Sequence, residues 1–295
     1  MIDLQKRWAK ELKRRIYNAQ GRNRPDLDQY YDEYRALFQK GFERNATRAE
    51  LVRQLGLSQV AYFGDYHTLK TSQKTVAILL EQVITEHGRK VLLGLEMLHT
   101  AHQEHADAYL AGSITEDQFL KAINYSYTWG FNWTNFRLLF DLARKHGLKV
   151  IGLNSHATSR KGTLVMRDKN AAALVSAATM MYPGHLVAVL FGDLHVGETH
   201  LPARVRELLG ARGIERRDLI VYQNSETFYW ELVRQGKEQV VDAVRVKKGV
   251  YCIMNATPLV KFQSWLNWQE QGGELEFTGI DSLGHEYRGQ TDLTQ

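Results

Sequence analysis

The 295 residues are 44% hydrophobic and 24% charged, a globular composition that excludes a mostly disordered chain. A single cysteine, Cys252, excludes an intramolecular disulfide framework, fits a reducing compartment and is expected to be a buried, inert thiol. The N-terminal segment has no continuous apolar run, and every later run of membrane-spanning length contains charges. We therefore expect a soluble, cytoplasmic protein with no membrane span.

The net charge of +5 comes from the first 60 residues, which hold 13 Lys and Arg against 8 Asp and Glu. Within them Leu4, Trp8, Leu12 and Ile16 recur every four residues, a spacing that predicts an amphipathic helix with basic side chains around its apolar stripe. Such a helix can contact nucleic acid or an acidic membrane. Docking of the stripe on the rest of the protein is the favoured interpretation, and nucleic acid is the less expected partner.

Three helices are predicted over residues 2–57, and from residue 58 apolar strands alternate with helices. This alternation predicts an α/β fold, a mainly parallel sheet with helices on both faces. Residues 99–147 are too long for one crossover helix and predict a helical insertion after the second strand. Predicted strands are 59–64, 90–98, 148–154, 185–192, 218–223 and 249–254.

Capping residues indicate where several helices begin: Thr71 or Ser72, the box Ser113–Glu116, Thr134, and Thr257 followed by proline. After Gly272 a polar, glycine-bearing tail suggests a hairpin. The expected organisation is a helical extension (1–57), an α/β core (58–224) and a C-terminal section packed on that core (225–295).

Two predicted strands end in nearly the same five residues, FGDYH at 63–67 and FGDLH at 191–195. Each copy puts an aspartate and a histidine where a buried strand stops, as Asp65 with His67 and as Asp193 with His195. Glu96 lies near the end of a third apolar strand. Because ligands bind outside the carboxyl ends of parallel strands, these side chains are expected to share one rim of the sheet.

Two imidazoles with carboxylates are a first shell for Zn²⁺, Mn²⁺ or Fe²⁺ with open positions for water, which predicts His67, Glu96 and His195 as metal ligands. An ionised Glu96 among leucines is costly without a cation or a donor. Asp65 and Asp193 are expected to orient the imidazoles or to serve as ligand and base. The alternative for each aspartate is a hydrogen bond within its turn.

Other polar residues are expected near the same rim. Asn154 ends the third predicted strand and is a candidate for the substrate pocket. Arg167 either clamps a substrate anion, pairs with Glu96 or lies on the surface. Asp168 beside it fits the cap of the following helix.

The run YSYTWGFNWTNF at residues 125–136 gathers aromatic side chains in the predicted insertion. Trp129 and Trp133 are candidates for the wall of a substrate pocket. The same aromatics can instead form the core of the insertion, which is favoured for Trp133 and Phe136.

The order FGDYH, LGLEM, WGFNWTNFRLLFDLARKHGLKVIGLN, MRDKNAA and VLFGDLH resembles the ChaN-like branch of the haem-binding-uptake, Tiki and erythromycin-esterase superfamily. The resemblance covers about residues 58–224. Its signature is a pair of G-x-x-H motifs with a glutamate on the strand between them, here Gly64–His67, Glu96 and Gly192–His195. Asp65 stands where many members of the superfamily carry glutamate.

The resemblance implies three activities. Tiki-like members are metal-dependent proteases, esterase-like members open a lactone with His and Glu, and ChaN proteins dimerise around stacked haems held by a tyrosine. Candidates for such a tyrosine are Tyr66, Tyr125 and Tyr127, by location only.

The leading hypothesis is a metal-dependent hydrolase of ester or amide bonds that acts on a small molecule or a peptide, with Asp65, Glu96, Asp193 and Arg167 as catalytic residues. The runner-up is a haem- or iron-binding protein, and a third reading is a catalytically inactive relative. The sequence does not decide whether the protein forms a homodimer.

Overall fold

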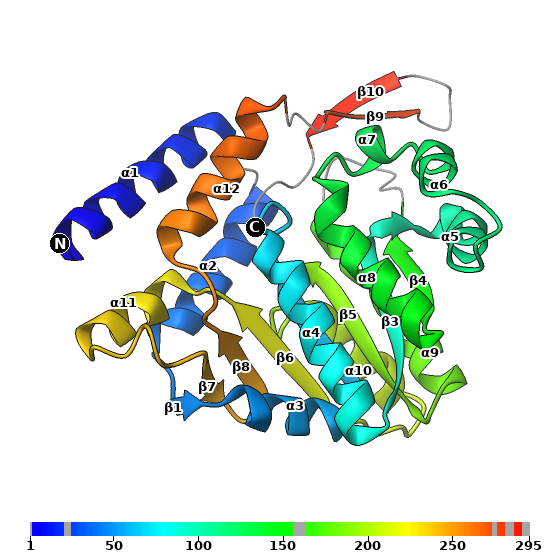
Figure 1. The fold of residues 1–295 in the computed structure, drawn as a ribbon, viewed down its shortest axis with the longest axis horizontal. Helices are drawn as coiled ribbons and strands as arrows, with labels where there is room; N and C mark the ends of the chain where they lie inside the picture. Colours follow the sequence, from blue (N-terminus) through cyan, green and yellow to red (C-terminus); the bar gives the residue numbers. More distant parts are fainter. Residues whose placement is uncertain (1, 21–24, 156–162, 273–275, 281–285, 291–295) are drawn as a thin grey trace.

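The computed structural model describes residues 2–20, 25–155, 163–272, 276–280 and 286–290. Within them one eight-stranded sheet carries helices on both faces, which confirms the predicted α/β class (Figure 1). Its strands are β1 (Arg44–Ala46), β2 (Val60–Asp65), β3 (Lys90–His99), β4 (Lys149–Asn154), β5 (His185–Gly192), β6 (Asp218–Gln223), β7 (Ala243–Lys247) and β8 (Val250–Ile253).

The strand order is β1-β7-β8-β6-β2-β5-β3-β4. The stretch from β8 to β4 is parallel throughout, whereas β7 and β1 continue the sheet as antiparallel strands at one edge. All six predicted strands are present. The sheet also runs into the C-terminal section, since β8 and β7 lie beyond residue 224. Strand β2 lies near the middle, between β5 and β6, so its carboxyl end is surrounded by other strand ends.

Helices α4 and α8 cover one face of the sheet, and α9 and α10 cover the other (Figure 1). Helix α1 packs along α12, so the two terminal sections meet. The helices are α1 (Ile2–Gln20), α2 (Pro25–Gln39), α3 (Arg48–Gly56), α4 (Lys70–His87), the 3₁₀ turn η1 (Thr100–His102), α5 (Gln103–Leu110), α6 (Glu116–Ala122), α7 (Tyr125–Thr128), α8 (Trp133–His146), α9 (Thr163–Met181), α10 (Leu201–Gly210), α11 (Glu226–Arg234) and α12 (Pro258–Glu270).

The predicted helix starts are shifted by two or three residues at three places. Helix α4 begins at Lys70 after an extended Leu69, α6 is capped by Thr115 rather than Ser113, and α8 by Asn132 rather than Thr134. In each case the sequence offers neighbouring residues that can cap, and backbone geometry selects among them. Thr257 caps α12 with Pro258 as first helical residue, as predicted.

The predicted helical insertion after the second strand is formed by η1 and α5 to α8. Trp133 lies inside it, with ring centroids 5.4 Å from Tyr125 and 5.3 Å from Phe140, so it belongs to the core of the insertion. The suggested tail hairpin is present as the antiparallel pair β9 (Glu276–Ile280) and β10 (Glu286–Gln290).

The apolar stripe of α1 docks only in part. Ile16 is buried and Leu12 is half-buried, whereas Leu4 and Trp8 remain 44% and 59% exposed. Ala9, which the four-residue spacing did not select, is fully buried instead. Among the helices of the described residues, none combines the length and apolarity that crossing a membrane requires.

Candidate functional site

The two Gly-Asp-x-His motifs meet because β2 and β5 are neighbours in register. Asp65 lies opposite Gly192, the last residue of β5. A Cβ atom built on Gly192 would lie 3.6 Å from Glu96 Oε2 and 3.7 Å from ring carbons of both His67 and His195. The three predicted ligands therefore converge on one point at the carboxyl ends of the strands, where the sequence placed them.

His67 lies between two carboxylates. Its Nδ1 is 2.8 Å from Asp65 Oδ2, and its Nε2 is 3.7 Å from Glu96 Oε2. Gln73, from the first turns of α4, donates to Asp65 Oδ1 at 2.5 Å and holds the carboxylate in place. Burial raises the pKa of Asp65 above its ordinary value, and the hydrogen bond with His67 opposes that rise. With Asp65 ionised, the Nδ1 proton of His67 points at it, which directs Nε2 toward Glu96.

His195 has a matching carboxylate partner in Asp168, whose Oδ1 lies 2.6 Å from His195 Nδ1. Asp168 is fully buried inside α9, five residues from its start, so the capping role expected for it is wrong. Its other oxygen accepts a hydrogen bond of 2.7 Å from the hydroxyl of Tyr30 on α2. Burial alone disfavours the imidazolium, but the charge and hydrogen bond of Asp168 outweigh it and raise the pKa of His195.

Glu96 has the donor partners that its burial demands. The guanidinium of Arg167 is hydrogen-bonded to Oε1, and the backbone N–H of Gly192 donates to Oε2 at 2.7 Å. Of the three readings of Arg167, the structure selects the pairing with Glu96. An arginine and an amide donor together stabilise the ionised carboxylate in a buried place.

Asp193 is held by residues from the two ends of the chain. Its Oδ2 lies 3.3 Å from the Lys261 ammonium on α12 and accepts from the Tyr34 hydroxyl on α2 at 3.3 Å. Lys261 is buried and also lies over the ring of Tyr66, 4.7 Å from its centroid. The sequence analysis did not identify Lys261 or Tyr34 as site residues. The one available signal concerns Lys261, a lysine on the apolar side of the segment PLVKF.

The missing side chain of Gly64 makes room for the carboxylate of Asp193. A Cβ atom at Gly64 would lie 2.1 Å from Asp193 Oδ1, a distance that no real contact has. We therefore expect Gly64→Ala to lower the free energy of unfolding by about 1–3 kcal/mol, because the buried carboxylate has to move. Urea denaturation measures the change, with Gly184→Ala as control because nothing lies within 4 Å of its added methyl group. Equal stability of the two variants would contradict the packing described here.

The remaining predicted residues divide between the site and its surroundings. Trp129 is buried against His67, with ring centroids 4.6 Å apart, and Phe131 lies 4.9 Å away. These rings give His67 an apolar wall. Asn154 ends β4 and uses its side-chain oxygen to accept from the Ser155 N–H, which is a local turn contact.

The tyrosines proposed as haem ligands differ in exposure. Tyr66 and Tyr125 are buried, and burial raises the pKa of each well above its ordinary value, so neither readily becomes a phenolate. Tyr127 is 39% exposed on α7.

The arrangement of the His, Asp and Glu side chains at the site favours proton transfer over binding of a metal ion. Within the described residues, no group of three or more His, Cys, Asp and Glu side chains is arranged to hold a metal. Both oxygens of Glu96 already accept hydrogen bonds, Oε1 from Arg167 and Oε2 from the Gly192 N–H. The residues present therefore do not fit the predicted divalent ion.

The family described as "Haem-binding uptake, Tiki superfamily, ChaN" matches residues 51–172 of this chain. That range contains the first Gly-Asp-x-His motif, Glu96, Arg167 and Asp168, whereas the second motif follows it. A search of curated proteins gave no match.

Three solved structures are similar to the chain. ChaN of Campylobacter jejuni, a cofacial haem complex, is 14% identical over 60% of this chain and 86% of that one, with a TM-score of 0.43. RRSP, a MARTX toxin effector domain from Vibrio vulnificus, is 19% identical over 61% and 37% of the two chains, with a TM-score of 0.42. The C-terminal region of Pasteurella multocida toxin is 14% identical over 49% and 20%, with a TM-score of 0.38. The match thus spans only a part of either toxin chain.

Proposed function

We propose that this chain, whose residues 51–172 match the family described as haem-binding uptake, Tiki superfamily, ChaN, hydrolyses ester or amide bonds at the site around Gly192. The observation that carries the proposal is the convergence of two buried His–Asp pairs and Glu96 on that glycine. The substrate class is a small molecule or a peptide with a carbonyl group. The chemistry is acid–base catalysis by side chains, without a metal ion.

His67 is the general base of the proposed reaction. Asp65 fixes its Nδ1 proton, so Nε2 takes a proton from water while the water oxygen attacks the carbonyl carbon. Glu96, which is paired with Arg167, lies 3.7 Å from Nε2 and stabilises the imidazolium that forms. The negative charge of Glu96 therefore lies beside His67 when His67 takes up a proton and becomes positive.

His195 is the general acid. Asp168 raises its pKa, so more of it is imidazolium near neutral pH than of an ordinary histidine. As the carbon–oxygen or carbon–nitrogen bond breaks, His195 gives a proton to the leaving group. After the products leave, His67 releases its proton to solvent and His195 takes one up from solvent, which restores both histidines for the next turnover.

The pH dependence of the rate tests this assignment. An acid with a raised pKa is active below that pKa, so we expect the rate to fall on the alkaline side as His195 loses its proton. Asp168→Asn removes the carboxylate that raises the pKa, and the alkaline limb is expected to move to lower pH. A pH–rate profile of kcat/KM measures the shift, with the exposed Asp141→Asn as control. An alkaline limb that stays in place in Asp168→Asn refutes His195 as the acid.

Haem binding is a second candidate, favoured by the family description and by the exposed phenol of Tyr127. We expect haem to give a Soret band with the protein and Tyr127→Phe to weaken that band strongly. Tyr17→Phe is the matched control, since Tyr17 is 59% exposed on α1. A titration in which haem gives no band, or the same band with Tyr127→Phe, rules out this tyrosine as the ligand.

A further inference from the structure

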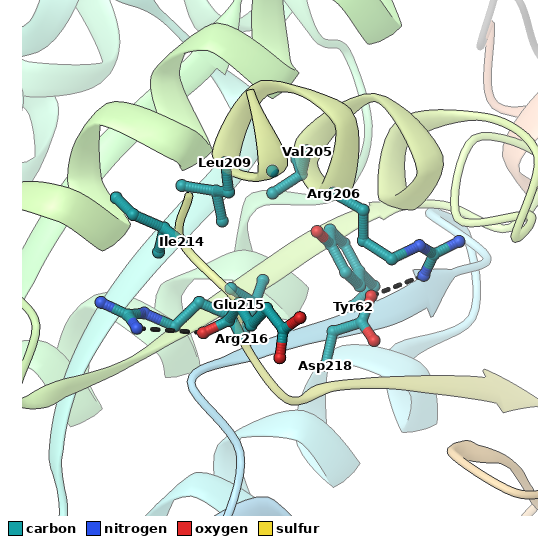
Figure 2. Close-up of a pocket in the computed structure, with 10 residues that line it drawn as sticks. Tyr62, Val205, Arg206, Leu209, Ile214, Glu215, Arg216 and Asp218 are labelled. Carbon is teal, nitrogen blue, oxygen red and sulfur yellow. Dashed lines mark hydrogen bonds and ion pairs between the residues drawn. The ribbon is translucent and has the colours of Figure 1, made fainter. Parts of the chain in front are cut away.

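A cavity lies away from the Gly192 site, where α10 crosses the starting ends of β2 and β6 (Figure 2). Its volume is about 280 Å³. Because drug-sized ligands occupy pockets of roughly 300–1,000 Å³, this cavity suits a smaller molecule of about ten non-hydrogen atoms. The lining residues used below are Val60, Tyr62, Val205, Leu209, Ile214 and the ion pair Arg206–Asp218.

Tyr62 is the polar group at the inner wall. In Figure 2 its ring reaches from the strand toward α10, with Val205 and Leu209 across from it. The side chain is fully buried, and its hydroxyl has no hydrogen-bond partner among the described residues. An unsatisfied buried hydroxyl destabilises a protein, and such a group is retained when something else supplies its partner. Burial raises the pKa of Tyr62 well above its ordinary value, so the hydroxyl keeps its proton and can donate it.

The second unpartnered atom of the lining is also a donor. The Nε–H of Arg216 is buried and has no hydrogen-bond partner among the described residues. The ligand that completes this cavity therefore brings an acceptor rather than a donor.

The rest of the wall is aliphatic or carries charges of both signs, Arg206 and Arg216 against Glu215 and Asp218. Val60, Val205, Leu209 and Ile214 provide aliphatic surface. Arg206 donates to Asp218 Oδ2 at 2.6 Å and to the Glu198 carbonyl at 2.7 Å, so its charge is already balanced. The lining thus carries two arginines and two carboxylates, so an anion placed here would lose its water without meeting an excess of positive charge, which disfavours charged ligands.

We propose that this cavity binds a small, uncharged, apolar molecule with a carbonyl group, whose oxygen accepts a hydrogen bond from the hydroxyl of Tyr62. The site is separate from the one at Gly192. Along β2, Tyr62 and Asp65 point to opposite faces of the sheet because side chains alternate. Occupancy therefore adds packing at the α10 face without touching the histidines.

The test is calorimetric titration of the full chain with 2-heptanone as the probe and with hexanoate as its charged counterpart. We expect saturable binding of 2-heptanone with a dissociation constant on the order of 0.1–1 mM, and at least about tenfold weaker binding of hexanoate. Tyr62→Phe removes only the hydroxyl and is expected to weaken binding about 5–10-fold. Leu209→Trp fills the cavity and is expected to abolish binding.

Two controls separate this cavity from other sites. Tyr62→Phe is expected to fold normally, because it removes an unsatisfied buried group, and its melting temperature checks this. Trp8→Ala alters the groove between α1 and α12, where a ketone could also bind, and is expected to leave the affinity unchanged. Absence of saturation, equal affinity in Tyr62→Phe, equal affinity for hexanoate, or loss of binding in Trp8→Ala would each overturn the proposal.

Discussion

Replacing Lys261 with methionine is expected to lower the free energy of unfolding by about 3–5 kcal/mol. Lys261 and Asp193 form a buried ion pair of 3.3 Å, and their side chains are only 8% and 1% exposed. Methionine fills the space of the lysine stem but leaves the Asp193 carboxylate without its cation. An uncompensated buried charge accounts for the large expected loss. Urea denaturation of wild type and variant measures it.

Two further variants separate charge from packing. Lys261→Met combined with Asp193→Asn removes both charges and is expected to recover part of the lost stability. Lys13→Met is the matched surface control, because Lys13 forms an ion pair with Glu226 at 2.7 Å but is 54% exposed, and it is expected to cost at most about 1 kcal/mol. A cost for Lys261→Met no larger than that for Lys13→Met would contradict the role of the buried pair.

Replacing His67 with glutamine is expected to lower kcat/KM for ester hydrolysis by about 10²–10⁴-fold, the usual contribution of a general base. Glutamine keeps a polar side chain of similar length next to Trp129 and Asp65 but cannot take a proton from water. Initial rates across a series of 4-nitrophenyl esters and fluorogenic peptides provide the measurement.

The control for this loss is His105→Gln, which changes an exposed histidine of α5. Melting temperatures and far-ultraviolet circular dichroism establish that His67→Gln retains the fold. If folded His67→Gln hydrolyses substrates at the rate of the wild type, His67 is not the base.

The sheet was largely predictable because its parallel strands are nearly continuous apolar runs. Strands of the β5 type, HLVAVLFG, are buried on both faces and leave little ambiguity. Strands β1 and β7 were missed because β1 has only three residues, Arg44 to Ala46, and β7, next to that edge strand, alternates valine with basic side chains. Their positions depend on pairing with distant segments, which the local pattern does not encode.

The centre of the site was predictable by one rule, that buried strands carry functional residues at their carboxyl ends. It located His67, Glu96 and His195, and the position of Gly192 between them agrees with it. The residues that decide their chemistry come from elsewhere. Tyr30 lies on α2 and Lys261 on α12, so their contacts with the site join segments more than 60 residues apart in sequence.

The hydrogen-bond partners of Arg167 and Asp168 could not be predicted from the sequence either, because they depend on contacts between distant segments. Arg167 had three plausible roles, and only the fold brings it to Glu96. Asp168 was expected to cap a helix, but α9 begins earlier and carries it to His195. The predicted metal site depended on counting ligand types. In the fold the Glu96 oxygens accept hydrogen bonds from Arg167 and the Gly192 N–H, and Nε2 of His67 lies 3.7 Å from Glu96 Oε2.

The most direct test is the rate of ester and peptide hydrolysis by purified protein before and after prolonged dialysis against EDTA, together with elemental analysis. For a metal-free hydrolase we expect an unchanged rate and far less than one equivalent of zinc, manganese or iron per chain. A rate that disappears on dialysis and returns with one of these ions would contradict the metal-free mechanism, and a protein that hydrolyses none of the substrates would contradict the proposed hydrolase activity.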